Sequence, residues 1–396
     1  MIAKSDFDPQ CITYSQMNLI FNSQMYYVRL TIWIRVYILS RFLGIGTADE
    51  LFGRLYTEAL DQADMLKVNF GRENAALYSQ MLGRFVIILR DYISAQLEGD
   101  TEAMAQNNEL LQQNISERAA FLTSLNPYWN ESEYGPLLTT YKEYILEIVD
   151  FYADQDYDRD FVVYDRLRKQ IELIGYIFAE GLYNYITSGT GPGTLPPQGE
   201  PCITYEQLSA IFVIRMFWIE LNTWIRNYML SRYVGLGLSD QILDRLKGVP
   251  VEFVGFLRLI FSEAAGDEYV QLFENYIDLI DQFITAQMEN NATRINEITQ
   301  QLFQNADARA ALFVSLNPYL NEGQWRNMMR NNVRTTINES TTFLTGNYAR
   351  NIEIFSSLLD QAENMGNAFT DGLLRYRESR TQALLGFSGV PQFTPL

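Results

Sequence analysis

Apolar residues recur at steps of three and four over most of the chain, which is the spacing of one face of an α-helix. The clearest stripe follows Tyr14 and ends before Gly44; its members are Met17, Ile20, Phe21, Met25, Val28, Ile32, Val36 and Leu39. A second long stripe runs from Tyr205 to Val234. No segment shows the alternation of apolar and polar residues, bounded by hairpin turns, that marks a strand. The pattern therefore predicts an all-α fold.

Shorter helices are expected next, after Thr47-Ala-Asp49 and Leu238-Ser-Asp240, where hydroxyl and carboxylate side chains can cap free backbone amides. The later helices of the first half are expected over about 73–97, from 101 to the Asn126-Pro127 step, from 131 onwards, and over about 159–186. The residue before a proline avoids helical geometry, which places the end of the fourth helix. Each half is thus predicted to be an antiparallel bundle of four long helices and two shorter ones.

The two halves are copies of one pattern at a constant offset of 191 residues, from Cys11 to Ile186 and from Cys202 to Tyr376. Ser124-Leu-Asn-Pro-Tyr128, for example, recurs as Ser315-Leu-Asn-Pro-Tyr319. The predicted organisation is a first repeat (1–186), a Gly/Pro-rich linker (187–201), a second repeat (202–377) and a tail (378–396). The tail carries four apolar residues that can pack on its own bundle or on a neighbouring subunit: Phe387, Val390, Phe393 and Leu396.

Composition narrows the range of partners. The formal charge of −18 disfavours nucleic acid and anionic membrane surfaces, and suits calcium or a basic partner. Tyrosine (25) and phenylalanine (24) are abundant and lysine is scarce, a bias typical of protein interfaces that compositional drift would also produce. Arginines interrupt the longest apolar stretch, so no membrane insertion is predicted. The polar N-terminus lacks the apolar core of a signal peptide, so synthesis in the cytoplasm is expected.

The chain contains no histidine, which excludes histidine-assisted nucleophiles, histidine zinc sites and the Glu-x-x-His pairs of di-iron bundles. Among the arginines that both copies keep are Arg35/Arg226, Arg41/Arg232, Arg54/Arg245 and Arg118/Arg309. Arg35 and Arg226 lie among apolar residues, so a buried guanidinium there would need a carboxylate partner. We predict structural ion pairs with Glu172 and Glu363 on the last helix of each repeat. The alternative is a metal site of carboxylates alone, built on Glu172 and Glu180, in a metal-dependent enzyme.

An acidic cluster is specific to the first copy: Asp154, Asp156, Asp158, Asp160 and Asp165. Its alternation is similar to a calcium-binding loop, although Arg159 stands where the sharp turn favours glycine and Asp165 where a bidentate Glu is expected. The cluster is either a calcium site or a solvated acidic turn. No other cofactor is expected.

The two cysteines, Cys11 and Cys202, occupy the same position of the two copies. They can bridge if the repeats pack about a two-fold axis, they can cross-link neighbouring molecules, or they can remain free. Because two cysteines in so long a chain do not form a disulfide framework, the free thiols are the favoured interpretation.

The pattern resembles a family of uncharacterised ferritin-like helical-bundle proteins of Firmicutes. The residues that carry the resemblance are Trp33-Ile-Arg35 with Ser40, Arg54-Leu55, Glu98-Gly-Asp100, the segment 114–129 and its equivalent 305–320. The resemblance implies a ferritin-like four-helix core with inner-face histidines on the first, third and fifth helices. Their places are taken here by Leu30, Phe85 and Tyr141, and by Leu221, Tyr276 and Asn332.

These observations lead to three functional hypotheses. The favoured one is a non-enzymatic structural protein whose ancestral site is filled and which assembles with itself into a homo-oligomer, filament or layer. A spore or cell-surface setting follows from the resemblance alone. The alternatives are a module that binds calcium or a small apolar ligand, and an enzyme with a carboxylate-bound metal.

Overall fold

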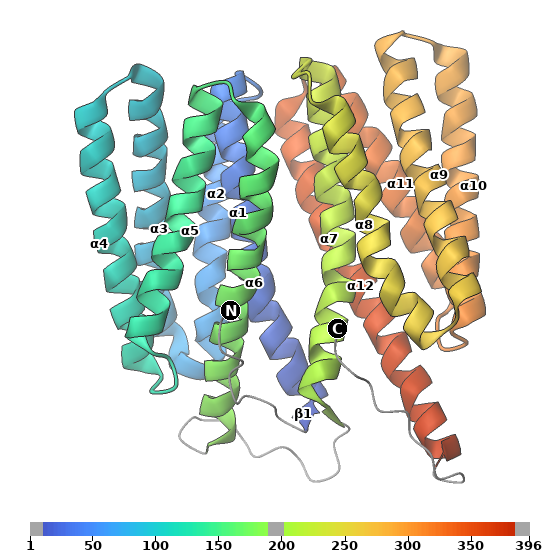
Figure 1. The fold of residues 1–396 in the computed structure, drawn as a ribbon, viewed down its shortest axis with the longest axis horizontal. Coiled ribbons are helices and arrows are strands. Elements are labelled where there is room, and N and C mark those ends of the chain that lie inside the picture. Colours follow the sequence, from blue (N-terminus) through green and yellow to red (C-terminus); the bar gives the residue numbers. More distant parts are fainter. Residues whose placement is uncertain (1–10, 189–201, 385–396) are drawn as a thin grey trace. The chain divides into compact units, whose positions relative to one another are not determined.

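The chain folds almost entirely into α-helices, as the apolar spacing predicts (Figure 1). The computed structural model describes residues 11–188 and 202–384. These divide into two compact units, Met1–Tyr205 and Glu206–Leu396. The all-α helical-bundle prediction is confirmed. The linker residues 189–201 and the apolar tail with Phe387, Val390, Phe393 and Leu396 lie outside the described residues.

The first unit is a closed ring of helices in which each helix packs on the next and the last returns to the first. Its α-helices are α1 (Tyr14–Leu43), α2 (Ala48–Gln62), α3 (Lys67–Glu98), α4 (Thr101–Leu125), α5 (Glu131–Ala153) and α6 (Asp160–Thr187). Two short 3-10 turns, η1 (Ala63–Leu66) and η2 (Tyr157–Arg159), precede α3 and α6. Helix α5 also contacts α1 and α3, so these helices enclose a common interior.

The second unit repeats this order of six α-helices. Its helices are α7 (Tyr205–Val234), α8 (Ser239–Ile260), α9 (Glu263–Met288), α10 (Ala292–Leu316), α11 (Glu322–Leu344) and α12 (Tyr348–Leu384). In each unit two α-helices are shorter than the other four, as predicted: α2 (15 residues) and α5 (23 residues) in the first, and α8 (22 residues) and α11 (23 residues) in the second. In the first unit Gly71, with φ +84°, breaks the backbone just before the predicted start of the third helix.

The shared Ser-Leu-Asn-Pro-Tyr motif fixes the turn between the fourth and fifth helices. Asn126 is fully buried; its Nδ2 donates to the Gly181 carbonyl at 3.0 Å and its Oδ1 accepts from the Tyr128 amide at 2.9 Å. Trp129 donates from Nε1 to the Phe178 carbonyl at 3.1 Å. A β-carbon at Gly181 would overlap the Trp129 ring, so this close approach requires glycine. The motif is therefore structural.

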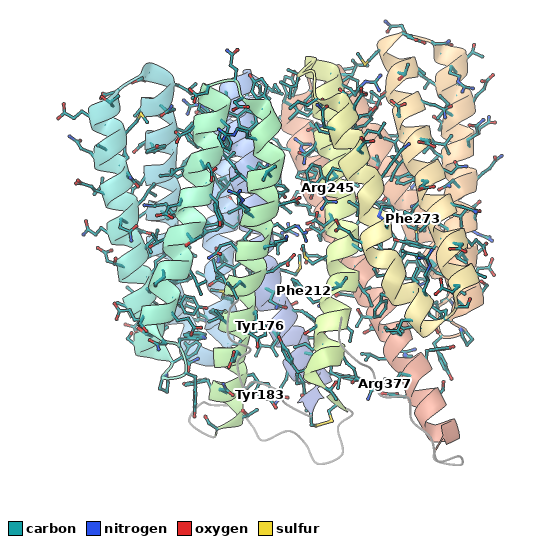
Figure 2. All side chains as sticks on the ribbon, viewed as in Figure 1. Tyr176, Tyr183, Phe212, Arg245, Phe273 and Arg377 are labelled. Atoms are coloured by element: carbon teal, nitrogen blue, oxygen red, sulfur yellow. A yellow bond between two sulfur atoms is a disulfide. The ribbon has the colours of Figure 1, made fainter. Side chains whose placement is uncertain are left out.

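The two cysteines form a disulfide, so the favoured interpretation of free thiols was wrong. Cys11 and Cys202 have Cα atoms 5.1 Å apart, beside a two-residue antiparallel ladder that joins β1 (Ile12–Thr13) to β2 (Cys202–Ile203). Tyr183 of α6 donates from its hydroxyl to the Cys11 carbonyl at 3.1 Å (Figure 2). The bridge closes a covalent loop of 191 residues around the first unit.

One helix in the described ranges, α7, is long and apolar enough over Gln207–Val234 to cross a membrane by length and composition. Within the protein, 82% of that apolar window is buried. The core helix of a bundle has the same length and composition, so this one segment is weak evidence for a membrane span.

Candidate functional site in the bundle interiors

The interior positions where the family resemblance places histidines are filled by packed side chains. In the first unit Phe85 and Tyr141 stack with ring centroids 6.5 Å apart, and the Tyr141 hydroxyl lies 2.8 Å from Thr31 Oγ1. In the second unit Asn332 donates from Nδ2 to Asn222 Oδ1 at 3.3 Å. Among the described residues no group of three or more Cys, Asp or Glu is placed to hold a metal ion.

Arg35 is buried in the first bundle and binds an acid on the last helix, but a different acid from the one predicted. Asp160, 1% exposed, contacts the guanidinium through both carboxylate oxygens. Tyr152 adds a hydrogen bond of 3.0 Å to Asp160 Oδ2. Burial works to lower the pKa of Arg35, but Asp160 and Tyr152 together raise that pKa above its ordinary value. The pair is a buried, hydrogen-bonded charge pair rather than a reactive one.

Arg226, the equivalent arginine of the second bundle, is bound by an acid on a different helix. Its Nη1 lies 2.5 Å from Glu339 on α11 and donates to Asn351 Oδ1 at 2.8 Å. Asn351 stands at the position of Asp160, and Glu339 at the position of Ile148. The carboxylate has therefore moved from the sixth helix to the fifth, while the buried cation has stayed.

The predicted partners Glu172 and Glu363 lie too far along the last helix to make these pairs. Glu172 accepts a hydrogen bond of 2.8 Å from Arg168 within α6. In the second unit Glu363 acts on Arg215, whose pKa burial lowers to about 10 against the attraction of Asp371 and Glu363. Helices α1 and α6 run antiparallel, so an arginine late in α1 meets the start of α6. The prediction chose the right helix in the first unit and the wrong register.

Arg54 is another arginine that both copies keep. It stacks on Trp33, with its guanidinium carbon 5.1 Å from the ring centroid. Glu58, 3% exposed, contacts Arg54 one turn along α2 and also accepts from Arg29 Nε at 2.8 Å. One buried carboxylate thus serves two arginines.

In the second unit the same stack persists with a different acid. Arg245 lies 5.1 Å over Trp224, and Glu220 lies 3.9 Å from Arg245 and accepts from Trp224 Nε1 at 3.0 Å (Figure 2 labels Arg245). Glu220 stands at the position of Arg29, and Val249 at the position of Glu58. The first position thus changes from arginine to glutamate, and the second from glutamate to valine. Again the arginine keeps a carboxylate.

The fourth shared arginine is held identically in both units but without an acid. Arg118 Nε donates to Asn114 Oδ1 at 2.9 Å, and Asn114 Nδ2 donates to the Met81 carbonyl at 2.9 Å. The guanidinium carbon of Arg118 lies 4.6 Å from the centroid of the Phe85 ring. Among the described residues no carboxylate pairs with Arg118, whose Nη2 has no hydrogen-bond partner. This arginine is 2% exposed.

Arg309 repeats this arrangement in the second unit. Its Nε donates to Asn305 Oδ1 at 2.8 Å, and Asn305 Nδ2 donates to the Leu272 carbonyl at 2.9 Å. It lies 4.0 Å over Tyr276 and 5.0 Å over Phe273, which Figure 2 labels. Burial lowers the pKa of Arg309 to about 10, which the nearby Tyr276 and Tyr269 only partly offset. At neutral pH the group therefore remains a buried cation.

The acidic cluster of the first copy does not converge on one point among the described side chains. Asp160 belongs to the ion pair with Arg35, which corrects its assignment as a calcium ligand. Asp156 lies 3.7 Å from Arg159 at the surface, and Asp165 lies 3.9 Å from Arg168 in a half-buried contact. The Asp158 side chain lies outside the described residues, and Asp154 caps the end of α5 with a backbone hydrogen bond.

Comparison with protein-family models, curated proteins and solved structures finds no match to this chain. The resemblance to ferritin-like bundles therefore stays a prediction. The sequence did signal the shared arginines, because both copies keep them. It did not signal the buried tyrosines Tyr27, Tyr78 and Tyr134, since tyrosine in an apolar stripe is equally typical of an ordinary core.

Proposed function

We propose that the protein is a non-enzymatic structural protein that assembles with copies of itself. The observation that carries this proposal is a set of exposed apolar residues that recurs in both bundles. Large apolar side chains are exposed at three equivalent pairs of positions: Val68/Leu259, Leu97/Met288 and Tyr128/Tyr319. The first pair is the most exposed, at 73% and 66%.

Single exposed apolar residues are common on any protein, so one such side chain carries no argument. The recurrence does, because the two copies differ even in their buried charges. Arg29 is replaced by Glu220, and Asp160 by Asn351, yet these three surface positions remain apolar. Contact with a second protein molecule at these positions explains why both copies keep them apolar.

These positions lie at both ends of each bundle. Val68 begins α3 and Tyr128 lies in the turn between α4 and α5, at one end, while Leu97 lies at the turn between α3 and α4, at the other (Figure 1). At the first end Phe70 packs on Tyr185 with centroids 4.8 Å apart, which extends the apolar character inward. Apolar ends on a duplicated chain favour head-to-tail contacts, which grow into open assemblies.

The disulfide supports a setting outside the reducing cytoplasm, because such bonds persist in oxidising environments. The Cys11–Cys202 bridge also limits how far the first unit can open while its ends bear load. Both properties suit a component of a spore layer or a cell surface.

The proposal is tested on the full-length, oxidised protein by electron microscopy and light scattering at micromolar concentration. We expect regular filaments, layers or oligomers that the variant V68E/Y128E/L259E/Y319E converts to dispersed particles with unchanged helicity. The matched control is L77E/L110E, which alters two exposed positions that are apolar in the first copy only, since the second copy has Glu268 and Gln301 there. Dispersed wild-type particles at all concentrations would overturn the proposal.

A further inference from the structure

Both bundles hold hydrogen-bond donors without protein partners around a buried cation. In the first bundle these are Arg118 Nη2 and the hydroxyls of Tyr27, Tyr78 and Tyr134. The Tyr27 hydroxyl lies near those of Tyr78 and Tyr134, and Arg118 lies near the Tyr78 hydroxyl, but none of these contacts has full hydrogen-bond geometry. All four side chains belong to the enclosed interior of the ring of helices.

The tyrosines do not supply the missing negative charge. Burial, joined by the neighbouring tyrosines, raises the pKa of Tyr27 and Tyr134 well above the ordinary value, and burial raises the pKa of Tyr78 as well. The phenols are therefore neutral at physiological pH and present O–H donors. A buried cation with no counter-charge is costly, so its retention in both copies needs an explanation.

The second bundle changes the donors but keeps their chemistry. Arg309 presents Nη1 and Nη2, and Tyr269 its hydroxyl, again without protein partners; the Tyr276 hydroxyl lies near Thr336 but without full hydrogen-bond geometry. Trp218 stands at the position of Tyr27, and its indole N–H, which has no partner either, replaces the phenol hydroxyl. Trp218 packs on Phe273, the same ring on which Arg309 stacks.

The replacement of a hydroxyl by an indole decides the kind of ligand. A hydroxyl donates or accepts, whereas an indole N–H and a guanidinium only donate. A water molecule would leave the buried charge without a counter-charge, and a cation would be repelled by the arginine. An anion satisfies donors alone and neutralises the buried charge.

We propose that the interior of each bundle binds one small monovalent anion, of halide size, on its unpaired arginine and the neighbouring aromatic donors. The anion must be small, because the surrounding rings are closely packed: the centroids of Tyr269 and Phe273 lie 4.6 Å apart, and those of Tyr78 and Phe121 lie 6.1 Å apart. The anion supplies the counter-charge that the other buried arginines receive from Asp160, Glu339, Glu58 and Glu220. Binding makes the folded state depend on halide.

The direct test is a bromide-containing crystal of the full-length protein, measured at the bromine absorption edge. We expect an anomalous peak within about 4 Å of the guanidinium of Arg118 and of Arg309, a contact distance for a charge-assisted hydrogen bond to a large ion. No peak at either arginine, with bromide visible elsewhere on the protein, would overturn the proposal.

The solution test compares thermal unfolding in chloride and in gluconate at equal ionic strength. At a chloride concentration about 100 times the Kd, Tm is expected to rise by about 5 °C. The rise should vanish in R118M/R309M and persist in R84M/R330M, which removes two exposed, ion-paired arginines. An equal rise in both variants would assign the effect to general salt action and sink the site.

A second variant keeps the test decisive if R118M/R309M does not fold. Y78F/Y269F removes one equivalent hydroxyl from each bundle and leaves the arginines in place. We expect the halide Kd to increase about tenfold, the loss of one hydrogen bond to a charged group. An unchanged Kd would show that these hydroxyls do not face the ion. Neither outcome depends on whether the protein assembles with itself.

Discussion

The two bundles hold the same buried arginines with different acids, and the difference separates what the fold requires from what it tolerates. Arg35 is paired with Asp160 on the last helix, and Arg226 with Glu339 on the helix before it. The exchange is reciprocal, because an acid is lost at one position and gained at another. The fold requires a carboxylate beside this cation but accepts it from either neighbouring helix.

The two carboxylates also differ in what their burial costs. Burial raises the pKa of Glu339 above its ordinary value, although Arg226 pulls the pKa down. A raised folded pKa means that the contribution of this acid to stability is full at low pH and falls as pH rises through the folded value. The burial of this carboxylate is thus a cost that Arg226 offsets only in part, which a buried charge pair commonly shows.

The largest expected effect comes from breaking the pair in one bundle only. D160N introduces into the first bundle the amide that the second bundle carries at Asn351, without the acid that accompanies it there. The buried guanidinium of Arg35 loses its carboxylate, so we expect the first unit to lose about 3–5 kcal/mol of unfolding free energy. Hydrogen exchange measured by mass spectrometry on the full chain reports both units, and the second unit is the internal control.

The double variant I148E/D160N then rebuilds the arrangement of the second bundle in the first. Ile148 is fully buried and stands where Glu339 stands in the second unit. We expect the double variant to recover about 0.5–3 kcal/mol relative to D160N, the usual range of coupling between contacting residues. I148E alone should be destabilising. A double variant less stable than D160N would show that the two interiors are not interchangeable.

The disulfide gives the second largest expected effect, again confined to one unit. C11S/C202S removes a bond that closes a loop of 191 residues in the first unit, and the second unit has no counterpart among the described residues. We expect a loss of about 2–4 kcal/mol in the first unit, because the unfolded chain regains the freedom that the bond removed. Urea unfolding with and without a reducing agent, followed by hydrogen exchange in each unit, measures this loss. The reducing agent should leave the stability of C11S/C202S unchanged.

The comparison also shows which parts of the structure the sequence could predict. The apolar spacing and the offset of 191 predicted helices and repeats, because both depend on local periodicity. The acid partners of Arg35 and Arg226 were mispredicted, because the register between neighbouring helices such as α1 and α6 depends on how they pack. The apolar pattern of one helix does not contain that information. The same holds for Cys11 and Cys202, whose pairing follows from the ladder between β1 and β2, which has two residues on each side.

The smallest expected effect distinguishes the interiors by pH. Burial raises the pKa of Tyr141 to about 12, partly offset by its contact with Thr31, whereas the equivalent residue of the second unit, Asn332, does not titrate. The folded pKa lies above the unfolded value near 10, so the stability contributed by the neutral phenol is complete below about pH 10 and declines as pH rises towards 12. The decline is about 1.4 kcal/mol per pH unit at its steepest.

The variant Y141F removes the titrating group and leaves Thr31 bonded to the Tyr27 carbonyl at 3.0 Å, so the stability of this variant at pH 8 should nearly match that of wild type. Urea unfolding at pH 8, 10 and 11.5 checks this, with tyrosinate absorbance recorded in parallel; equal slopes for wild type and Y141F would mean that Tyr141 is not the group that titrates.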